Sequence, residues 1–148
     1  MPRIEISRTV QAPLEKLVEI ARNVERYPEI MPDVKSIEIV EKSEDGRRQV
    51  TRWVGTISQF KMTVKWTQEE TWNEDFTRVD FRQTEGDYDK MEGYWEFKPA
   101  DGQTEFTSVL EYEYRVPLLG PLVSKVIHML AEQNVRSAMD AIAKEAEA

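Results

Sequence analysis

Hydrophobic and polar side chains alternate over much of the chain, and the clearest alternation runs through residues 60–72, FKMTVKWTQEETW. One face begins with large apolar residues, but Gln68 and Glu70 then occupy that same face between Trp66 and Trp72. A period of two is typical of a β-strand with one buried face. Because a closely packed core disfavours polar groups without partners, two polar side chains between two tryptophans predict a pocket.

Similar alternating segments predict seven strands in total. They cover residues 3–10, 34–43, 49–57, 58–72, 76–84, 91–98 and 104–116. Most neighbouring strands are joined by short connections, and turn dipeptides such as Asp45-Gly46 and Asp101-Gly102 stand in two of them. Such connections are typical of antiparallel hairpins.

Three segments have helical spacing instead. A short helix follows Pro13, and a second lies in VERYPEIM (24–31), where Pro28 begins or breaks it. After Pro117 the apolar residues recur with a period near 3.6, which predicts a helix of roughly 28 residues that extends close to the carboxyl end. Its apolar stripe consists of Leu119, Leu122, Val123, Val126, Ile127, Leu130, Ala138 and Ala141.

These elements predict a single α+β domain over residues 1–148, in which a curved seven-stranded antiparallel sheet wraps around the long carboxyl-terminal helix. The two short helices lie between the first and second strands and cover an edge. One helix is only about 10 Å wide and fills part of such a sheet. We therefore expect an internal cavity between the sheet and the long helix.

Composition and charge exclude several classes of function. The formal net charge of −8 over 148 residues opposes binding to nucleic acid. The chain has no cysteine and a single histidine, and it lacks Gly-rich phosphate loops and common hydrolase motifs, so we expect neither a metal nor a cofactor. No apolar run reaches the roughly 20 residues of a membrane span, and the first residues do not resemble a signal peptide. We expect a cytoplasmic protein without stable membrane insertion.

Four segments resemble a known family: YPEIMPDVKSIEIVEK (27–42), KWTQEETW (65–72), EGDYDKMEGYWEF (85–97) and EQNVRSAMDAI (132–142). With the order of elements, they resemble the START-like or Bet v 1-like superfamily (SRPBCC) and its helix-grip fold. Within it the chain is similar to the polyketide cyclase/dehydrase and coenzyme Q-binding START-like family. The resemblance covers essentially the whole chain and implies a cavity for a lipid, a quinone or a polyketide-like aromatic molecule.

The candidate ligand-binding residues combine inward strand positions, the helix stripe and this resemblance. They are Tyr27, Trp66, Gln68, Phe81, Trp95, Tyr112, Tyr114, Leu130 and Asn134. Catalytic candidates are Tyr112, Tyr114 and Glu70. The aromatase/cyclases that the chain resembles carry a pocket arginine and a tyrosine at the positions of Glu70 and Val34 here. This departure disfavours cyclase chemistry, because a carboxylate does not stabilise a developing enolate.

Three functions stay open. Binding of a hydrophobic small molecule is favoured, with a cyclase or dehydratase enzyme as the alternative and a protein-interaction module, suggested by relatives that act on ribosomes, as the third. The polar loop GDYD (86–89) is a candidate gate of the pocket. The sequence does not indicate an oligomeric state.

Charged side chains at inward positions leave a further choice. Arg8, Arg52, Gln68 and Glu70 are expected inside or near a strand end, where they either form an internal Arg–Glu pair or face a ligand. We favour pairing. His128 falls opposite the apolar stripe of the long helix and is predicted to lie on the surface.

Overall fold

The structure is a computed structural model, and it describes residues 2–57, 62–114 and 120–148. Seven strands and three α-helices follow one another, with one 3₁₀ turn. In chain order they are β1 (Arg3–Val10), α1 (Leu14–Arg22), η1 (Val24–Arg26), α2 (Tyr27–Ile30), β2 (Val34–Lys42), β3 (Arg48–Ile57), β4 (Met62–Trp72), β5 (Arg78–Gly86), β6 (Lys90–Ala100), β7 (Gln103–Glu113) and α3 (Gly120–Glu147).

All seven strands form one antiparallel sheet in the order β1-β7-β6-β5-β4-β3-β2. Strands that are consecutive from β2 to β7 are neighbours, and β1 adds to the free edge of β7. The predicted fold class, an α+β helix-grip architecture with two short helices after the first strand, is confirmed. Parts of three predicted elements lie outside the described residues. The predicted strand 58–72 extends into residues 58–61, and the predicted strand 104–116 and the predicted start of the long helix extend into residues 115–119.

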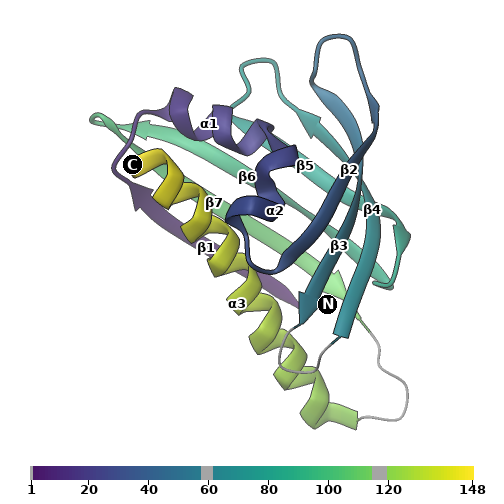
Figure 1. Ribbon diagram of the computed structural model, residues 1–148. Coiled ribbons are helices and arrows are strands. Elements are labelled where there is room, and N and C mark those ends of the chain that lie inside the picture. Colours follow the sequence, from purple (N-terminus) through teal and green to yellow (C-terminus); the bar gives the residue numbers. More distant parts are fainter. Residues whose placement is uncertain (1, 58–61, 115–119) are drawn as a thin grey trace.

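The helices lie on one face of the sheet and cover it unevenly (Figure 1). Helix α3 crosses the face diagonally and packs against β1, β7 and α1, whereas α2 packs against β2 at the opposite edge. The inner surface of the central strands lies between these two contacts. This arrangement leaves room for a cavity.

The solid core lies at the end of the sheet where α1 meets the last turns of α3. Phe97 of β6 and Phe106 of β7 stack there with ring centroids 4.7 Å apart, and both are buried, as are Met139 and Ile142 of α3 and Leu17 of α1. The end of α3 is therefore anchored on the sheet, and the polar residues that interrupt its stripe lie nearer its middle.

Replacing a phenylalanine should cost more in this core than beside the cavity. We expect Phe106→Ala to lower the free energy of unfolding by about 3–5 kcal/mol, because the ring is fully buried and its loss leaves a void. Phe81→Ala is the matched control. Its ring is half-buried and borders existing empty space, so a loss of about 1–2 kcal/mol is expected. Urea denaturation measures both, and equal losses would contradict this division of the interior.

Candidate functional site

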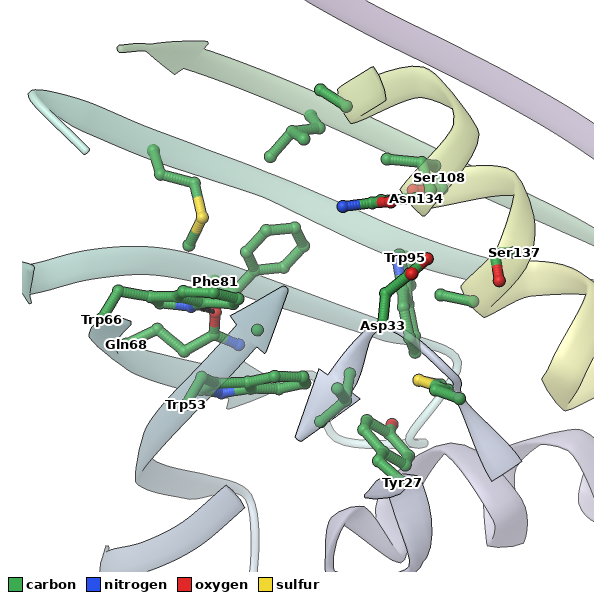
Figure 2. Close-up of a pocket in the computed structure, with 18 of the residues that line it drawn as sticks. Tyr27, Asp33, Trp53, Trp66, Gln68, Phe81, Trp95, Ser108, Asn134 and Ser137 are labelled. Carbon is green, nitrogen blue, oxygen red and sulfur yellow. Dashed lines mark hydrogen bonds between the residues drawn. The ribbon is translucent and has the colours of Figure 1, made fainter. Parts of the chain in front are cut away.

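A cavity of about 190 Å³ lies between the middle of α3 and the inner face of the sheet. Its walls are largely aromatic, and Figure 2 shows several of these rings together with polar side chains from α3. The aromatic residues that line it are Tyr27, Trp53, Trp66, Trp72, Phe81, Tyr88 and Trp95.

Five of these rings form a continuous series, which we call the aromatic wall: Trp95, Tyr27, Trp53, Trp66 and Tyr88. Successive ring centroids lie 6.3, 5.7, 5.4 and 5.7 Å apart. The central pair, which is directly opposite in the β3–β4 register, is stacked with an interplanar angle of 11°. The wall thus offers a ligand ring faces that are already fixed in place.

Two glycines make room for Trp66 in this wall. A Cβ on Gly55 would lie 3.3 Å from the indole ring, and one on Gly86 would lie 2.5 Å from the Trp66 Cα. Gly86 also has φ +152°, which favours glycine. The strand ends around Trp66 are therefore adapted to this one large side chain.

Polar side chains of β3 and β4 form a buried network around Glu70. Its Oε1 accepts a hydrogen bond of 2.7 Å from Gln49 Nε2, and its Oε2 accepts bonds of 2.7 Å from Thr51 Oγ1 and Gln68 Nε2. Gln49 is directly opposite Glu70 in the strand register, and Thr51 is opposite Gln68. Cross-strand pairing therefore assembles the network, and all the partners of this buried carboxyl group are uncharged.

The indole N–H groups of the stacked pair fix the direction of these hydrogen bonds. Trp66 Nε1 donates to Gln68 Oε1 at 2.8 Å, and Trp53 Nε1 donates to Thr51 Oγ1 at 2.7 Å. An indole N–H can only donate, so the Gln68 oxygen faces Trp66 and its NH₂ group faces Glu70. The same aromatic pair that lines the cavity thus orients the polar groups behind it.

Burial sets the protonation behaviour of the site. Loss of solvation raises the pKa of Glu70 above its usual value of 4.5, although the three hydrogen bonds act in the opposite direction. Burial, followed by the nearby Glu70, also raises the pKa of the Tyr27 phenol. The Tyr27 hydroxyl donates to the Ala21 carbonyl, so this residue presents its ring to the cavity.

Polar groups on the opposite side of the cavity have no partners. Asn134 and Ser137 of α3, Ser108 of β7 and the Asp33 carboxylate all line the cavity, and none has a side-chain hydrogen bond or ion pair within the described part of the chain. Burial raises the pKa of Asp33. These groups remain available to a ligand, in contrast to the satisfied network around Glu70.

The sequence matches the family described as polyketide cyclase/dehydrase and lipid transport over residues 10–139. The chain belongs to this family. Members of the family bind hydrophobic ligands or act as aromatase/cyclases, and the resemblance expected from the sequence is confirmed.

Individual relatives agree with this assignment. The ribosome association toxin RatA of Pseudomonas aeruginosa is 25% identical over 135 residues, which are 87% of this chain and 90% of that protein. The structure of TTHA0849 from Thermus thermophilus superposes with a TM-score of 0.90 at 30% identity, covering 98% of this chain and 97% of the other. The Zhui aromatase/cyclase from Streptomyces sp. R1128 gives 0.88 at 22% identity, covering 99% and 93%, and shares the fold.

In this family member the cavity contains most of the candidate residues. Those that line it are Tyr27, Trp66, Gln68, Glu70, Phe81, Trp95 and Asn134. Tyr112, Tyr114 and Leu130 are absent from the lining. Tyr112 and Tyr114 pack against Tyr88, at 6.5 and 5.5 Å between ring centroids, and Leu130 is buried. The two tyrosines therefore pack against Tyr88 of the wall, and a role in ligand contact stays a prediction for all of these candidates.

Two expectations about charged or titratable side chains are wrong. His128 is half-buried, with its Nδ1 3.0 Å from the Tyr112 hydroxyl and its ring stacked on that tyrosine, because α3 turns this position toward β7. Among the described residues, no arginine pairs with Glu70, whose hydrogen-bond partners are Gln49, Thr51 and Gln68. Arg8 pairs with Asp140 and the exposed Arg52 with Glu38, so both arginines are held near the surface.

Sequence reasoning missed several residues of the site, among them Trp53, Tyr88 and Asp33. Trp53 has the same parity as Gln49 and Thr51 in the predicted strand 49–57. Its place beside Trp66 depends on the register between β3 and β4, which the alternation within one strand does not give. Tyr88 belongs to the loop 86–89, which the sequence predicts as a candidate gate and not as part of the wall. Gln83 holds this loop in place through two hydrogen bonds to the Tyr88 backbone. Asp33 stands in the turn before β2, where periodicity gives no indication of direction.

None of the described helices is long and apolar enough to cross a membrane. Within the same described residues, no group of His, Cys, Asp or Glu side chains is arranged to hold a metal ion.

The pH dependence of stability should distinguish Glu70 from its neighbour Glu69. The folded state binds the Glu70 proton more tightly than the unfolded chain, so this residue favours folding below pH 4.5 and loses that contribution as pH rises through its folded pKa. Compared with wild type, Glu70→Gln should flatten the stability profile above pH 4.5. At neutral pH this variant should be as stable as wild type or more stable. The Gln49 side-chain amide can flip, so that its oxygen accepts a hydrogen bond from the new amide at position 70. Urea denaturation between pH 4 and 8 measures this.

Glu69→Gln provides the control with the opposite sign. Glu69 lies on the outer face and pairs with Arg48 and Arg82, which lower its pKa, so its contribution is present at neutral pH and lost on acidification. This variant should be less stable than wild type at pH 7 by no more than about 1 kcal/mol. Parallel profiles for both variants would contradict the assigned environments.

Proposed function

We propose that this protein binds a hydrophobic small molecule, with an aromatic or alicyclic body, in the cavity between the sheet and α3. The observation that supports it best is the aromatic wall opposite unpartnered polar groups. Ligand sites are typically apolar chambers with a few polar groups that orient the ligand. A lipid, a quinone and a polyketide-like aromatic molecule all have the apolar body and few polar groups of this description, and all agree with the family description.

The polar groups without partners strengthen the case for a ligand. A side chain that serves only the fold normally has its hydrogen bonds satisfied, as the Glu70 network has. Asn134 and Ser137 lie on the same side of α3 at the middle of the helix and border the cavity without a partner in the described chain. A hydroxyl or carbonyl group on a bound molecule would satisfy both.

Acid–base catalysis on a polyketide-like substrate is the second candidate. It is favoured by one observation, a buried carboxyl group with a raised pKa at the cavity wall. Such a group is protonated more readily than an exposed carboxylate, which suits a general acid. The version that uses Tyr112 and Tyr114 has less support, since neither lines the cavity and burial raises the pKa of Tyr112 to about 12.

A role as a protein-interaction module is supported by the similarity to the ribosome association toxin RatA alone. A net charge of −8 opposes association with the phosphate backbone of ribosomal RNA, and this function is therefore ranked third.

Binding can be tested with the neutral fluorescent probe N-phenyl-1-naphthylamine. We expect saturable binding with one site per chain, accompanied by quenching of tryptophan fluorescence. Ala138→Phe should weaken it at least tenfold, because residue 138 lines the cavity and a benzyl group would fill part of it. Gln133→Phe adds the same ring to an exposed position of α3 and should stay within twofold of wild type. If neither variant binds the probe more weakly than wild type, or if probe binding does not saturate, the cavity is refuted as the binding site.

Catalysis can be tested with a soluble poly-β-ketone mimic followed by absorbance. If Glu70 is a general acid or base, Glu70→Gln should lower the rate by about 10²-fold or more while probe affinity stays nearly unchanged. Tyr114→Phe, which lies away from the cavity, is the control and should retain the rate. Absence of turnover in the wild-type protein, with probe binding intact, would leave binding as the function.

A further inference from the structure

The described lining of the cavity is acidic. It contains two ionisable acids, Asp33 and Glu70, and no lysine, arginine or histidine. Two basic side chains that neighbour lining residues in sequence are engaged elsewhere: Arg22 lies over the Phe76 ring at 3.9 Å and Arg52 pairs with Glu38 on the surface. An anionic head group would find no counter-ion among these residues.

The two acids differ in what they can offer. Glu70 already accepts three hydrogen bonds from uncharged donors, whereas the Asp33 carboxylate has no partner within the described chain. In Figure 2 Asp33 points from the turn before β2 toward the side of the cavity formed by α3, where Asn134 and Ser137 lie. Among the described lining residues, Asp33 is therefore the carboxylate that a ligand can reach.

The aromatic wall has the same preference. The faces of tryptophan and tyrosine rings carry negative electrostatic potential and attract cations, most strongly where water is excluded. Trp53, Trp66 and Trp95 all border the cavity, and no basic side chain of the described lining occupies their faces. An ammonium group and a carboxylate both lose hydration on entering such a chamber, but Asp33 attracts the ammonium group and repels the carboxylate.

We propose that the cavity selects by charge and takes an apolar amine, with the protonated nitrogen at Asp33 and the hydrocarbon or aromatic body against the wall, while it rejects carboxylates of the same shape. This inference rests on the proposed binding function and names its ligand class. It predicts that fatty acids and other anionic amphiphiles are poor ligands despite their apolar bodies.

Three ligands that share one ring system and differ in the head group test the selection. They are 2-(1-naphthyl)ethylamine, 2-(1-naphthyl)ethanol and 1-naphthylacetate, which at pH 7 are cationic, neutral and anionic. Calorimetric titration and tryptophan quenching give the affinity of each for the full chain. We expect the amine to bind at least tenfold more tightly than the acetate, with the alcohol between them.

Asp33→Asn identifies the source of the selectivity. It removes the charge and keeps the shape, and it should reduce the amine-to-acetate ratio about tenfold while changing the alcohol affinity less than threefold. Glu25→Gln removes one charge from an exposed position outside the cavity and should leave the ratio unchanged. Thermal unfolding of each variant establishes that it is folded before the ratios are compared.

The outcomes separate the two proposals. If none of the three ligands and no neutral probe binds, the binding function fails. If the alcohol and the probe bind but the amine-to-acetate ratio is below ten, or is the same in Asp33→Asn, charge selection is overturned and binding stands. A ratio above ten that collapses only in Asp33→Asn supports the inference.

Discussion

The width of the sheet is the constraint on which the rest of the structure depends. Seven strands about 4.8 Å apart span roughly 29 Å, whereas one helix covers about 10 Å. Helix α3 packs on β1, β7 and α1, and α2 packs on β2, so the described helices leave part of the inner face of the central strands uncovered. Large side chains have to form the wall of that space, and β4 supplies several of them because Val64, Trp66, Gln68, Glu70 and Trp72 all face it.

The polar residues between the tryptophans of β4 follow from the same geometry. Large indole rings that face an open space bring N–H groups that require acceptors. Gln68 and Thr51 provide these acceptors, and each in turn donates a hydrogen bond to Glu70. The hydrogen bonds from Trp66 through Gln68 and from Trp53 through Thr51 both end at Glu70. A carboxyl group suits this position, because it accepts several hydrogen bonds at once. Three uncharged donors therefore satisfy Glu70, and no arginine of the described chain takes part in the network.

The spacing of hydrophobic residues predicted the helices and strands. The alternation along each strand predicted which of its residues face inward, since alternation alone decides which face a strand residue occupies. They failed where the answer depends on how elements meet. Tyr112 has the inward parity but lies under Tyr88 rather than beside the cavity, and His128 faces β7 because of how α3 is rotated. Asp33 and Tyr88 belong to connections, whose direction is set by backbone contacts such as the bond from Thr56 N to the Asp33 carbonyl.

The division of the interior separates stability from recognition. Burial of Phe97, Phe106, Met139 and Ile142 against α1 fixes one end of α3, so the fold does not require the other part of the interior to be filled. Side chains around the cavity can then carry polar atoms that have no protein partner but stay accessible, and no described side-chain N or O atom is both fully buried and without a hydrogen bond. The partly buried Asp33 carboxylate fits this view, because it keeps access to water or to a ligand. A family with one fold can therefore change its ligand by altering this half of the interior alone.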